Sequence, residues 1–479
     1  MSTIRQLTET PSGDESVADT STKVPGKFLK PILLGLFIFW TVDFVIKLAL
    51  DKHLSLDGVN YFFHILQNEG FANIAWSRRY TEYLTEWPLV LSVALGLSDI
   101  SSLSKVFGLG IFFPYLLSFG LCWLITDQKS RALLLFPLAS FVGFNLLSDY
   151  DVIADHHVLA VMTWPIMLLL IKHRPLEWQE GLLLWILVFA YSRMYETAVL
   201  NAFLFSLMLS FRISCFKMRR ETIICGVALV LFAVVVYISI QYIVNPRSPT
   251  NRGAFLNSIL VNQRNWEAVA TNSFLGIFFL GWLISDRWHS VKNTVFGLAL
   301  VPIVAYVLAR FMHPDYAITA HLSFSSRTLI AVVIPGLLIV CALTRILRNQ
   351  VTLTGLASFT LMFVVMVGFN LYDLRHWNEV KNEFVELSRS EQMFINIDET
   401  ALADPSLELR HHRWSWNNPL LSLVWSGGCV RTVVLNSEHG PQGPFDPRKK
   451  LVLKRYLEYD KRFRAIDNQI RECSDKRQL

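Results

Sequence analysis

The sequence from residue 31 to residue 50 reads PILLGLFIFWTVDFVIKLAL. Only Asp43 and Lys47 are charged in this stretch, and about 20 apolar residues in a helix are enough to cross a bilayer. We therefore expect an uncleaved membrane anchor here, and a polar, disordered tail over residues 1–30 before it. Basic residues favour the cytoplasmic side of a membrane, and three of them precede the anchor directly: Lys23, Lys27 and Lys30.

The composition extends this interpretation to the whole chain. Of the 479 residues, 53% are hydrophobic and only 17% are charged, whereas a soluble domain has about 25% charged residues. The 34 Phe, 14 Trp and 14 Tyr residues suit a protein with two membrane interfaces to anchor. These values exclude a soluble enzyme, a disordered regulator and a disulfide-rich secreted domain, and they indicate an all-α polytopic membrane protein.

Further apolar segments follow the anchor. The segment at 87–97 has only eleven residues, about half a span, so we expect an interfacial or re-entrant helix there. Together with the anchor, the other apolar segments predict eleven spans. They lie at about 105–125, 132–148, 157–171, 180–192, 196–211, 222–244, 272–285, 293–312, 328–344 and 351–371.

The charges of the connecting loops indicate whether the segment at 87–97 crosses the membrane. If this segment does not cross the membrane, five loops on the cytoplasmic side are all rich in Lys and Arg. The loop at 148–156, with three Asp and no Lys or Arg, then lies outside. If 87–97 does cross, all of these loops change sides, against the preference of Lys and Arg for the cytoplasm. The pattern therefore predicts that the N-terminus lies inside and the C-terminus outside.

The expected organisation is a membrane domain over 31–372, with an external loop at 51–104, and an external domain over 373–479. For the external domain we expect a small α/β fold, with a helix through about residue 389 and a basic helix over 449–473. Cys429 and Cys473 share this segment, so one disulfide is open to them. The chain has no Asn-X-Ser/Thr glycosylation motif, which favours a bacterial inner membrane and a periplasmic domain.

Asp57 marks the first external loop. It opens a short amphipathic helix that begins at the membrane surface, and a second helix is expected over 78–97. Asp is common at the start of helices, so Asp57 is either a helix cap or a functional carboxylate.

The second external loop carries five titratable side chains within nine residues: Asp149, Asp151, Asp155, His156 and His157. Asp149 and Asp151, with or without Asp57, can hold a divalent cation such as Mg²⁺ or Mn²⁺, because hard cations prefer carboxylate oxygens. A neighbouring Asp–His pair can instead transfer a proton. The third alternative is a solvated loop that marks the membrane boundary. So many titratable groups between helices at membrane depth favour a function over this alternative.

Basic residues on the same side suit an anionic ligand. Arg193 and Glu196 lie at the predicted break between two short helices, where an ion pair between them would stabilise the break. Arg327 follows two serines at the start of a predicted helix, with His321 nearby. This arrangement is typical of phosphate binding at a helix N-terminus, although Arg327 can equally extend from the membrane interface toward water.

The order of these features resembles the GT-C superfamily of polytopic glycosyltransferases. Members have an anchor helix, then a first external loop of two juxtamembrane helices with a catalytic Asp, then a second acidic motif in the next external loop. Asp57, the Asp149-x-Asp151 pair and the outward C-terminal segment match this order. Residues 155–158, Asp-His-His-Val, also look like an element of oligosaccharyltransferase catalytic subunits. The resemblance covers about the first 200 residues by pattern and the remainder by architecture.

The resemblance implies transfer of a sugar from a polyprenyl-phosphate donor to a glycan, lipid or protein acceptor. Asp57 would be the general base that accepts a proton from the acceptor hydroxyl, and the anomeric configuration would invert. The donor phosphate would be bound by Arg193, Arg327 and His321. The acceptor would be oriented, or a metal ion bound, by Asp149, Asp151, Asp155 and His156. The chain departs from peptide N-glycosylation enzymes because it has no Trp-Trp-Asp motif.

Other classes of protein stay open. A transporter or flippase of a lipid-linked sugar also needs many spans, but it predicts polar residues in mid-membrane, where this chain has few. A polysaccharide polymerase or ligase would share the donor chemistry. A purely structural membrane subunit would leave the acidic second loop unexplained. The expected partners are the lipid-linked donor, the acceptor and membrane lipids, and no nucleic acid is expected.

Overall fold

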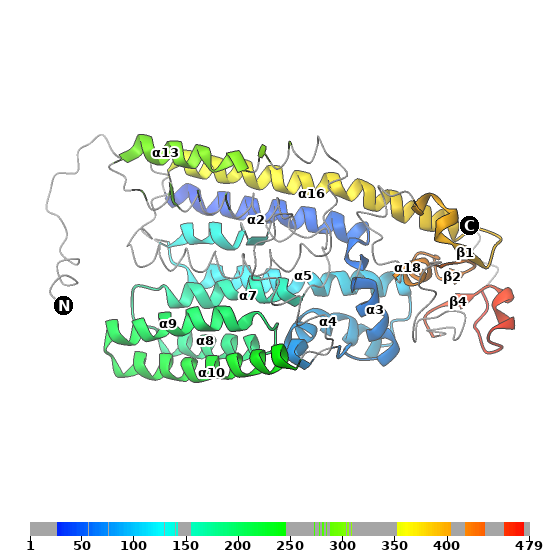
Figure 1. Ribbon diagram of the computed structural model, residues 1–479, viewed down its shortest axis with the longest axis horizontal. Coiled ribbons are helices and arrows are strands. Elements are labelled where there is room, and N and C mark those ends of the chain that lie inside the picture. The colour runs from blue at the N-terminus through cyan, green and yellow to red at the C-terminus, as the bar shows by residue number, and fades with distance from the viewer. Residues whose placement is uncertain are drawn as a thin grey trace.

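The computed structural model is a bundle of helices with a small mixed segment at one end (Figure 1). Among the described residues, four helices are long and apolar enough to cross a membrane. They are α2 (Gly26–Ala49), α5 (Ile100–Ile125), α9 (Ala198–Phe216) and α10 (Arg219–Val244). The structure describes residues 26–141 except Leu56, Ala75, Lys129 and Ala139; 155–245; 273, 277, 280, 281, 284, 288–302, 304, 305 and 308; 352–403; 417–435; and 455–473.

Shorter apolar helices complete the described bundle. They are α7 (Asp155–Leu170), α8 (Trp178–Tyr191) and the first half of α16 (Leu353–Leu387), with α13 (His289–Leu298) beside α16 and the short turn η5 (Arg131–Leu134) after α5. These elements agree with the predicted helical membrane protein. The predicted span at 328–344 lies outside the described residues, and those at 132–148, 272–285 and 293–312 are described only in part.

Two short helices join α2 to α5, as expected for the loop at 51–104. Helix α3 (Asp57–Asn68) begins at Asp57 and buries Phe62 and Phe63. After the turn η4 (Trp76–Arg78), α4 (Arg79–Ala94) covers most of the predicted helix over 78–97.

Helix α4 lies alongside α5 and presents an apolar face outward. A Cβ atom at Gly110 of α5 would lie 2.0 Å from the carbonyl oxygen of Thr85, so the two helices can approach this closely only at a glycine. The outer face of α4 has the apolar stripe expected of a helix at a membrane interface, made of the exposed side chains Tyr83, Trp87, Leu91 and Leu95.

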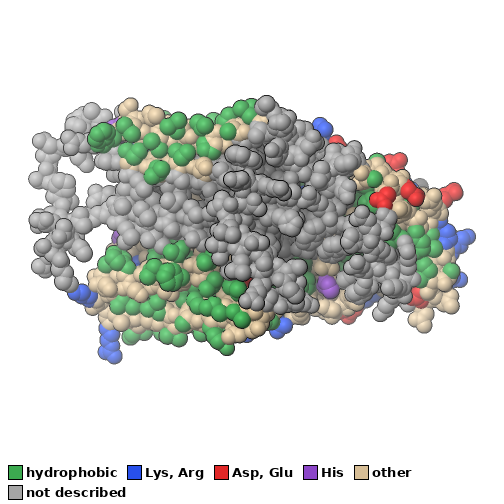
Figure 2. Space-filling view, viewed as in Figure 1, with side chains coloured by type: hydrophobic (Ala, Val, Ile, Leu, Met, Phe, Trp, Pro, Cys, Tyr) green, Lys and Arg blue, Asp and Glu red, His purple; other side chains and the backbone are tan. Residues whose placement is uncertain are grey.

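The bundle has two distinct ends. In Figure 1, α2 begins at the end where α9 turns into α10, whereas α3, α4 and the strands lie at the opposite end. We call these the Arg212 end and the Asp51 end. Several basic residues lie at the Arg212 end: Lys30 and Arg131 over the ring of Trp123, and Arg212 beside Lys172 and Arg174. In Figure 2, hydrophobic side chains lie along the helices at the upper left and the lower left of the view.

The C-terminal segment combines strands and helix, as predicted, and packs on α3. Strand β1 (Phe394–Asn396) pairs in parallel with β3 (Val433–Leu435), and β2 (Cys429–Val430) pairs in parallel with β4 (Glu458–Tyr459). Helix α18 (Asn418–Val424) contacts α3. Three short turns complete the segment: η7 (Ile397–Glu399), η8 (Ala401–Ala403) and η12 (Lys461–Ala465). One buried cluster joins both parts, with Phe62, Phe107, Trp377 and Val430 among its members.

Helix α16 runs across residue 373, so the membrane bundle and the C-terminal segment share one helix. One expectation about this segment is wrong. Residues 455–473, expected to be the end of a basic helix, form β4 and η12 instead.

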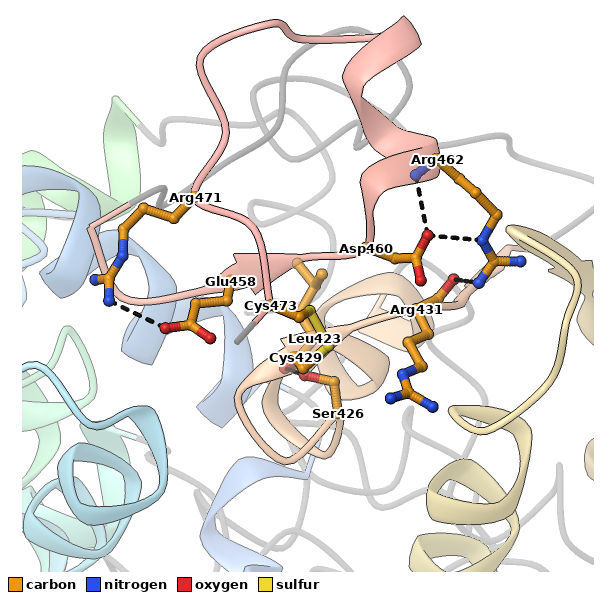
Figure 3. Close-up of a disulfide and its surroundings, with 9 residues drawn as sticks. All are labelled: Leu423, Ser426, Cys429, Arg431, Glu458, Asp460, Arg462, Arg471 and Cys473. Carbon is orange, nitrogen blue, oxygen red and sulfur yellow. Dashed lines mark hydrogen bonds and ion pairs between the residues drawn. A yellow bond between two sulfur atoms is a disulfide. The ribbon is translucent and has the colours of Figure 1, made fainter. Parts of the chain in front are cut away.

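Contacts within residues 455–473 and with β2 explain why this segment does not form a long helix. The rings of Tyr459 and Phe463 pack 5.7 Å apart in the core. The Asp460 carboxylate accepts a hydrogen bond from the backbone N–H of Arg462, which ends the strand and begins a short turn. A disulfide between Cys429 and Cys473 then ties this segment to β2 (Figure 3). The disulfide that the sequence left open is thus present.

Candidate active site at the Asp51 end

The predicted site residues belong to segments that meet around α4. Asp57 is the first residue of α3, and Asp155 and His156 are the first two residues of α7. Helix α4 contacts both α3 and α7, so the two helices that begin with predicted site residues share one neighbour (Figure 1). The remaining acidic and donor-binding candidates lie outside the described residues: Asp149, Asp151, His321 and Arg327.

The chain passes from α2 into α3 through residues 50–55, which we call the α2–α3 joint. It contains the turn η3 (Lys52–Leu54). Backbone hydrogen bonds follow each other along the joint: Asp51 N–H to Leu48 O, Leu54 N–H to Asp51 O, Ser55 N–H to Lys52 O and Gly58 N–H to Ser55 O, with lengths of 2.9 to 3.1 Å. The start of α3 is therefore fixed relative to the end of α2 by the conformation of the joint.

Two titratable side chains of the joint are buried. The Asp51 carboxylate lies between Lys105 of α5 and Lys381 of α16, with 2.6 Å from Oδ2 to the Lys381 Nζ. Burial raises the pKa of Asp51, but hydrogen bonds from Lys105 and Lys381 outweigh it and hold the pKa below its usual value. Burial lowers the pKa of His53 to about 4, and its Nε2 lies 2.9 Å from Ser104 Oγ. At neutral pH the joint thus holds an anionic Asp51 and a neutral His53.

Two buried glutamates of α4 hold the segment that joins α3 to α4. Glu86 Oε2 accepts a hydrogen bond of 2.8 Å from the backbone N–H of Ala72, and Glu82 Oε1 accepts one of 2.9 Å from that of Ile74. Buried backbone N–H groups need an acceptor. The glutamates supply it, and they fix the return of the chain from α3 to α4.

The ion pair predicted between Arg193 and Glu196 is not the one observed. Glu196 pairs with Arg78 of η4, with 2.7 Å from Oε1 to Nη2 and 3.2 Å from Oε2 to Nε. The break between α8 and α9 docks on the start of α4, because Tyr80 N–H donates to Arg193 O and Thr81 Oγ1 donates to Met194 O. This docking brings Glu196 to a partner 118 residues away in the chain rather than to its near neighbour.

Arg193 lies on an aromatic surface. Its guanidinium is 5.4 Å from the ring centroid of Trp76 and 6.0 Å from that of Tyr80. Within the described part of the chain it makes no ion pair. A guanidinium that is held by aromatic rings in this way keeps N–H donors for an anion such as a phosphate.

A buried polar trio lies inside the bundle. Tyr191 OH, at the end of α8, lies 2.9 Å from Thr163 Oγ1 of α7 and accepts a hydrogen bond of 2.6 Å from Asn201 Nδ2 of α9. All three side chains are buried. The trio therefore links three helices just below the break that carries Arg193.

No group of three or more His, Cys, Asp or Glu residues suited to a metal ion occurs among the described residues. Asp149 and Asp151 lie outside the described residues. The sequence pattern did not reveal the roles of Asp51, Arg78 or Trp76. The position of Asp51 directly after the anchor was the one available signal, because a charge at that place lies at the membrane boundary.

These contacts are the basis for assigning a function to the chain. No protein-family model, no curated protein and no solved structure matches it.

Proposed function

We propose that this protein is a membrane glycosyltransferase of the GT-C type, with eleven spans, its N-terminus in the cytoplasm and its C-terminal segment outside. It moves a sugar from a polyprenyl-phosphate donor to a glycan, lipid or protein acceptor at the Asp51 end. The observation that carries the proposal is the order of elements. An anchor helix (α2) is followed by two short helices (α3 and α4) and a long apolar helix (α5), and α3 begins at Asp57.

In the proposed reaction Asp57 is the general base. It accepts the proton of the acceptor hydroxyl while that oxygen attacks the anomeric carbon of the sugar. The bond between the anomeric carbon and the phosphate oxygen breaks, and the polyprenyl phosphate leaves with the bonding electrons. A carboxylate at a helix N-terminus is stabilised as an anion, which suits a base that must be deprotonated before the reaction.

The leaving phosphate needs a cation near the membrane surface. Among the described residues, Arg193 is our candidate for this cation, because its guanidinium lies on Trp76 and Tyr80 beside α4. Arg327 and His321 are proposed as further phosphate ligands, and Asp149, Asp151, Asp155 and His156 as ligands for the acceptor or for a divalent cation such as Mg²⁺ or Mn²⁺. Stabilising the negative charge of a departing phosphate in this way contributes strongly to the rate of reactions in which phosphate is the leaving group.

The disulfide supports an extracytoplasmic site. Disulfides persist in oxidising compartments such as the bacterial periplasm, and Cys429–Cys473 lies in the segment that packs on α3. We therefore propose a bacterial inner-membrane protein whose active site and C-terminal segment face the periplasm.

A transfer assay with wild-type protein and Asp57→Asn tests the proposal. Protein in proteoliposomes receives a panel of radiolabelled polyprenyl-phosphate sugars and a membrane extract as the source of acceptors. Loss of a general base lowers rates by about 10²- to 10⁴-fold, so Asp57→Asn should release at least about 100-fold less polyprenyl phosphate than wild type. Asp151→Asn should also lower the rate.

Asp99→Asn is the matched control. Asp99 lies in the same external loop and caps α5 by accepting a hydrogen bond of 2.7 Å from Ser102 N–H. Asn caps helices about as well as Asp, so this variant should keep wild-type turnover. Full turnover in both Asp57→Asn and Asp151→Asn would show that the site is assigned wrongly.

A flippase for the same lipid-linked sugar is the second candidate. The buried Asp43–Lys47 pair, 3.0 Å apart, and the Thr163–Tyr191–Asn201 trio place polar groups inside apolar helices, where transporters use them. The same proteoliposomes distinguish the two functions. Sugar lipid that crosses the bilayer without being consumed would support the flippase and contradict the transferase.

A further inference from the structure

The α2–α3 joint contains a buried charged cluster that takes no part in the proposed chemistry. We infer that Asp51 and Lys381 form a positioning clamp, in which α16 fixes the start of α3 and thereby the place of Asp57. The C-terminal segment would then control the catalytic loop through α16. This inference rests on the proposed function for the role of Asp57, but the clamp itself can be tested without it.

The backbone at Asp51 makes the joint dependent on its side chain. Asp51 has φ 59° and ψ 26°, the left-handed region that residues other than glycine adopt at an energetic cost. This conformation turns the chain out of α2, and the next hydrogen bonds lead directly into α3. If Asp51 relaxed to a right-handed conformation, the first turn of α3 would be displaced.

The Asp51 carboxylate holds this conformation from two sides. Oδ1 bonds to Lys105, whose Nζ also donates to the last carbonyls of α2, Leu48 O at 2.8 Å and Ala49 O at 3.0 Å. Oδ2 lies 2.6 Å from the Lys381 Nζ. Asp51 is only 7% exposed, so water screens its charge less than that of a surface carboxylate, and its two pairs are stronger than fully exposed pairs.

Helix α16 makes further contacts with the joint. Trp377 Nε1 donates to Leu50 O at 2.9 Å, and the Lys52 Nζ lies 5.0 Å from the Trp377 ring centroid. The α16 contribution is therefore not one ion pair but three contacts, to Leu50, Asp51 and Lys52.

The same part of α16 contacts the C-terminal segment. The ring of Trp425, which follows α18, lies 5.4 Å from the ring of Trp377 and 5.4 Å from that of Phe384. Helix α18 itself packs on α3. A ligand that shifts the C-terminal segment would consequently move both the joint and α3.

The test compares Asp51→Asn and Lys381→Met with wild type, using full-length protein in proteoliposomes. Asn adopts the left-handed conformation about as readily as Asp, so Asp51→Asn removes the charge without adding backbone strain. Hydrogen exchange at the amides of residues 54–62 should be about tenfold faster or more in both variants. In the transfer assay, kcat should fall by about 100-fold with KM little changed, because a small displacement of a catalytic group costs that much.

Arg375→Met is the control on the same helix, where it breaks an exposed ion pair of 3.2 Å with Glu379. It should change neither exchange nor turnover. Unchanged exchange in Asp51→Asn would overturn the clamp whatever the activity, and so would faster exchange with wild-type kcat. Faster exchange together with an inactive wild-type protein would support the clamp and contradict the proposed transferase function.

Discussion

Lys105 and Arg212 are basic side chains that complete helix C-termini at opposite ends of the bundle. Lys105 donates to the last carbonyls of α2, and Arg212 donates to Leu170 O at 2.9 Å and Lys172 O at 2.6 Å at the end of α7. The last four carbonyls of a helix have no partner within it, and a cation also suits the helix dipole. An acid balances each base, Asp51 at one end and Glu221 at the other. The two basic side chains therefore cap the C-termini of α2 and α7.

His53 leads to a prediction about pH. The pKa of His53 is about 4 in the folded protein because of burial, and near 6.5 in an unfolded chain. The unfolded state therefore binds the proton first, so this contribution to stability is complete above pH 6.5 and is lost as the pH falls toward 4. Between pH 7 and pH 5, wild type should lose about 2 kcal/mol more unfolding free energy than His53→Gln. Reversible unfolding in mixed detergent micelles measures both, and equal losses would refute the assignment.

At the scale of elements, α4 and α5 form a tightly packed antiparallel pair. Ring contact between Trp87 and Phe113 at 5.7 Å accompanies the close approach at Gly110. This pair keeps α4 at the Asp51 end with its apolar stripe outward. It therefore fixes η4, where Trp76 and Arg78 meet the α8–α9 break.

Gly110→Ala should weaken this pair. The added Cβ would lie 2.0 Å from the backbone oxygen of Thr85, which cannot rotate away, so we expect a loss of about 1–3 kcal/mol. Gly120→Ala on the same helix meets no atom within 4 Å. It should leave stability unchanged or raise it by up to about 1 kcal/mol, because Ala favours helix more than Gly. Thermal unfolding of both variants in detergent checks this, and similar melting temperatures would contradict the packing described for α4.

The sequence allowed the elements to be predicted where their physics is local. Length and apolar content located α2, α5, α9 and α10, and amphipathic pattern located α3 and α4. Residues 455–473 were predicted wrongly because their structure depends on β2 and on the disulfide, which are not local. Likewise, Glu196 has a nearer basic residue in the chain than the one it binds.

The candidate site was predictable only in part. Asp57 at the start of α3 follows from its place after the anchor. The Asp51–Lys381 pair could not be predicted, because 330 residues separate the two residues. The sequence around each of them gives no indication of its partner.

At the scale of the whole molecule, the bundle has one end at the turn from α9 to α10 and an opposite end that holds the proposed site. In Figure 1, the start of α2, which carries Lys30, and the turn from α9 to α10, near Arg212, lie at the end opposite α3 and α4. We propose that the Arg212 end faces the cytoplasm, because the positive-inside rule favours this side for the basic loops there. Two exposed residues, Cys215 near the end of α9 and Ser98 between α4 and α5, are placed to test this orientation.

Labelling from outside should therefore distinguish the two ends. In intact cells, a membrane-impermeant maleimide should modify the protein at position 98 in Ser98→Cys and leave Cys215 unmodified. After detergent is added, both should react, because both side chains are exposed. Mass spectrometry of the two peptides reads out each site separately. Modification of Cys215 in intact cells would show that the protein has the opposite orientation.

The separation of Asp51 from Lys381 also has a consequence for biosynthesis. A ribosome adds about 5–20 residues per second, so roughly 15–65 s pass between the synthesis of these two residues, 330 positions apart. During that time α2 is already made, whereas the partner that α16 supplies to the joint does not yet exist. The proposed catalytic loop is therefore completed late, after the apolar helices before α16 have been synthesised. Under the proposed function, a nascent chain that ends before Lys381 would have its anchor but not the Asp51–Lys381 pair, and it would be inactive.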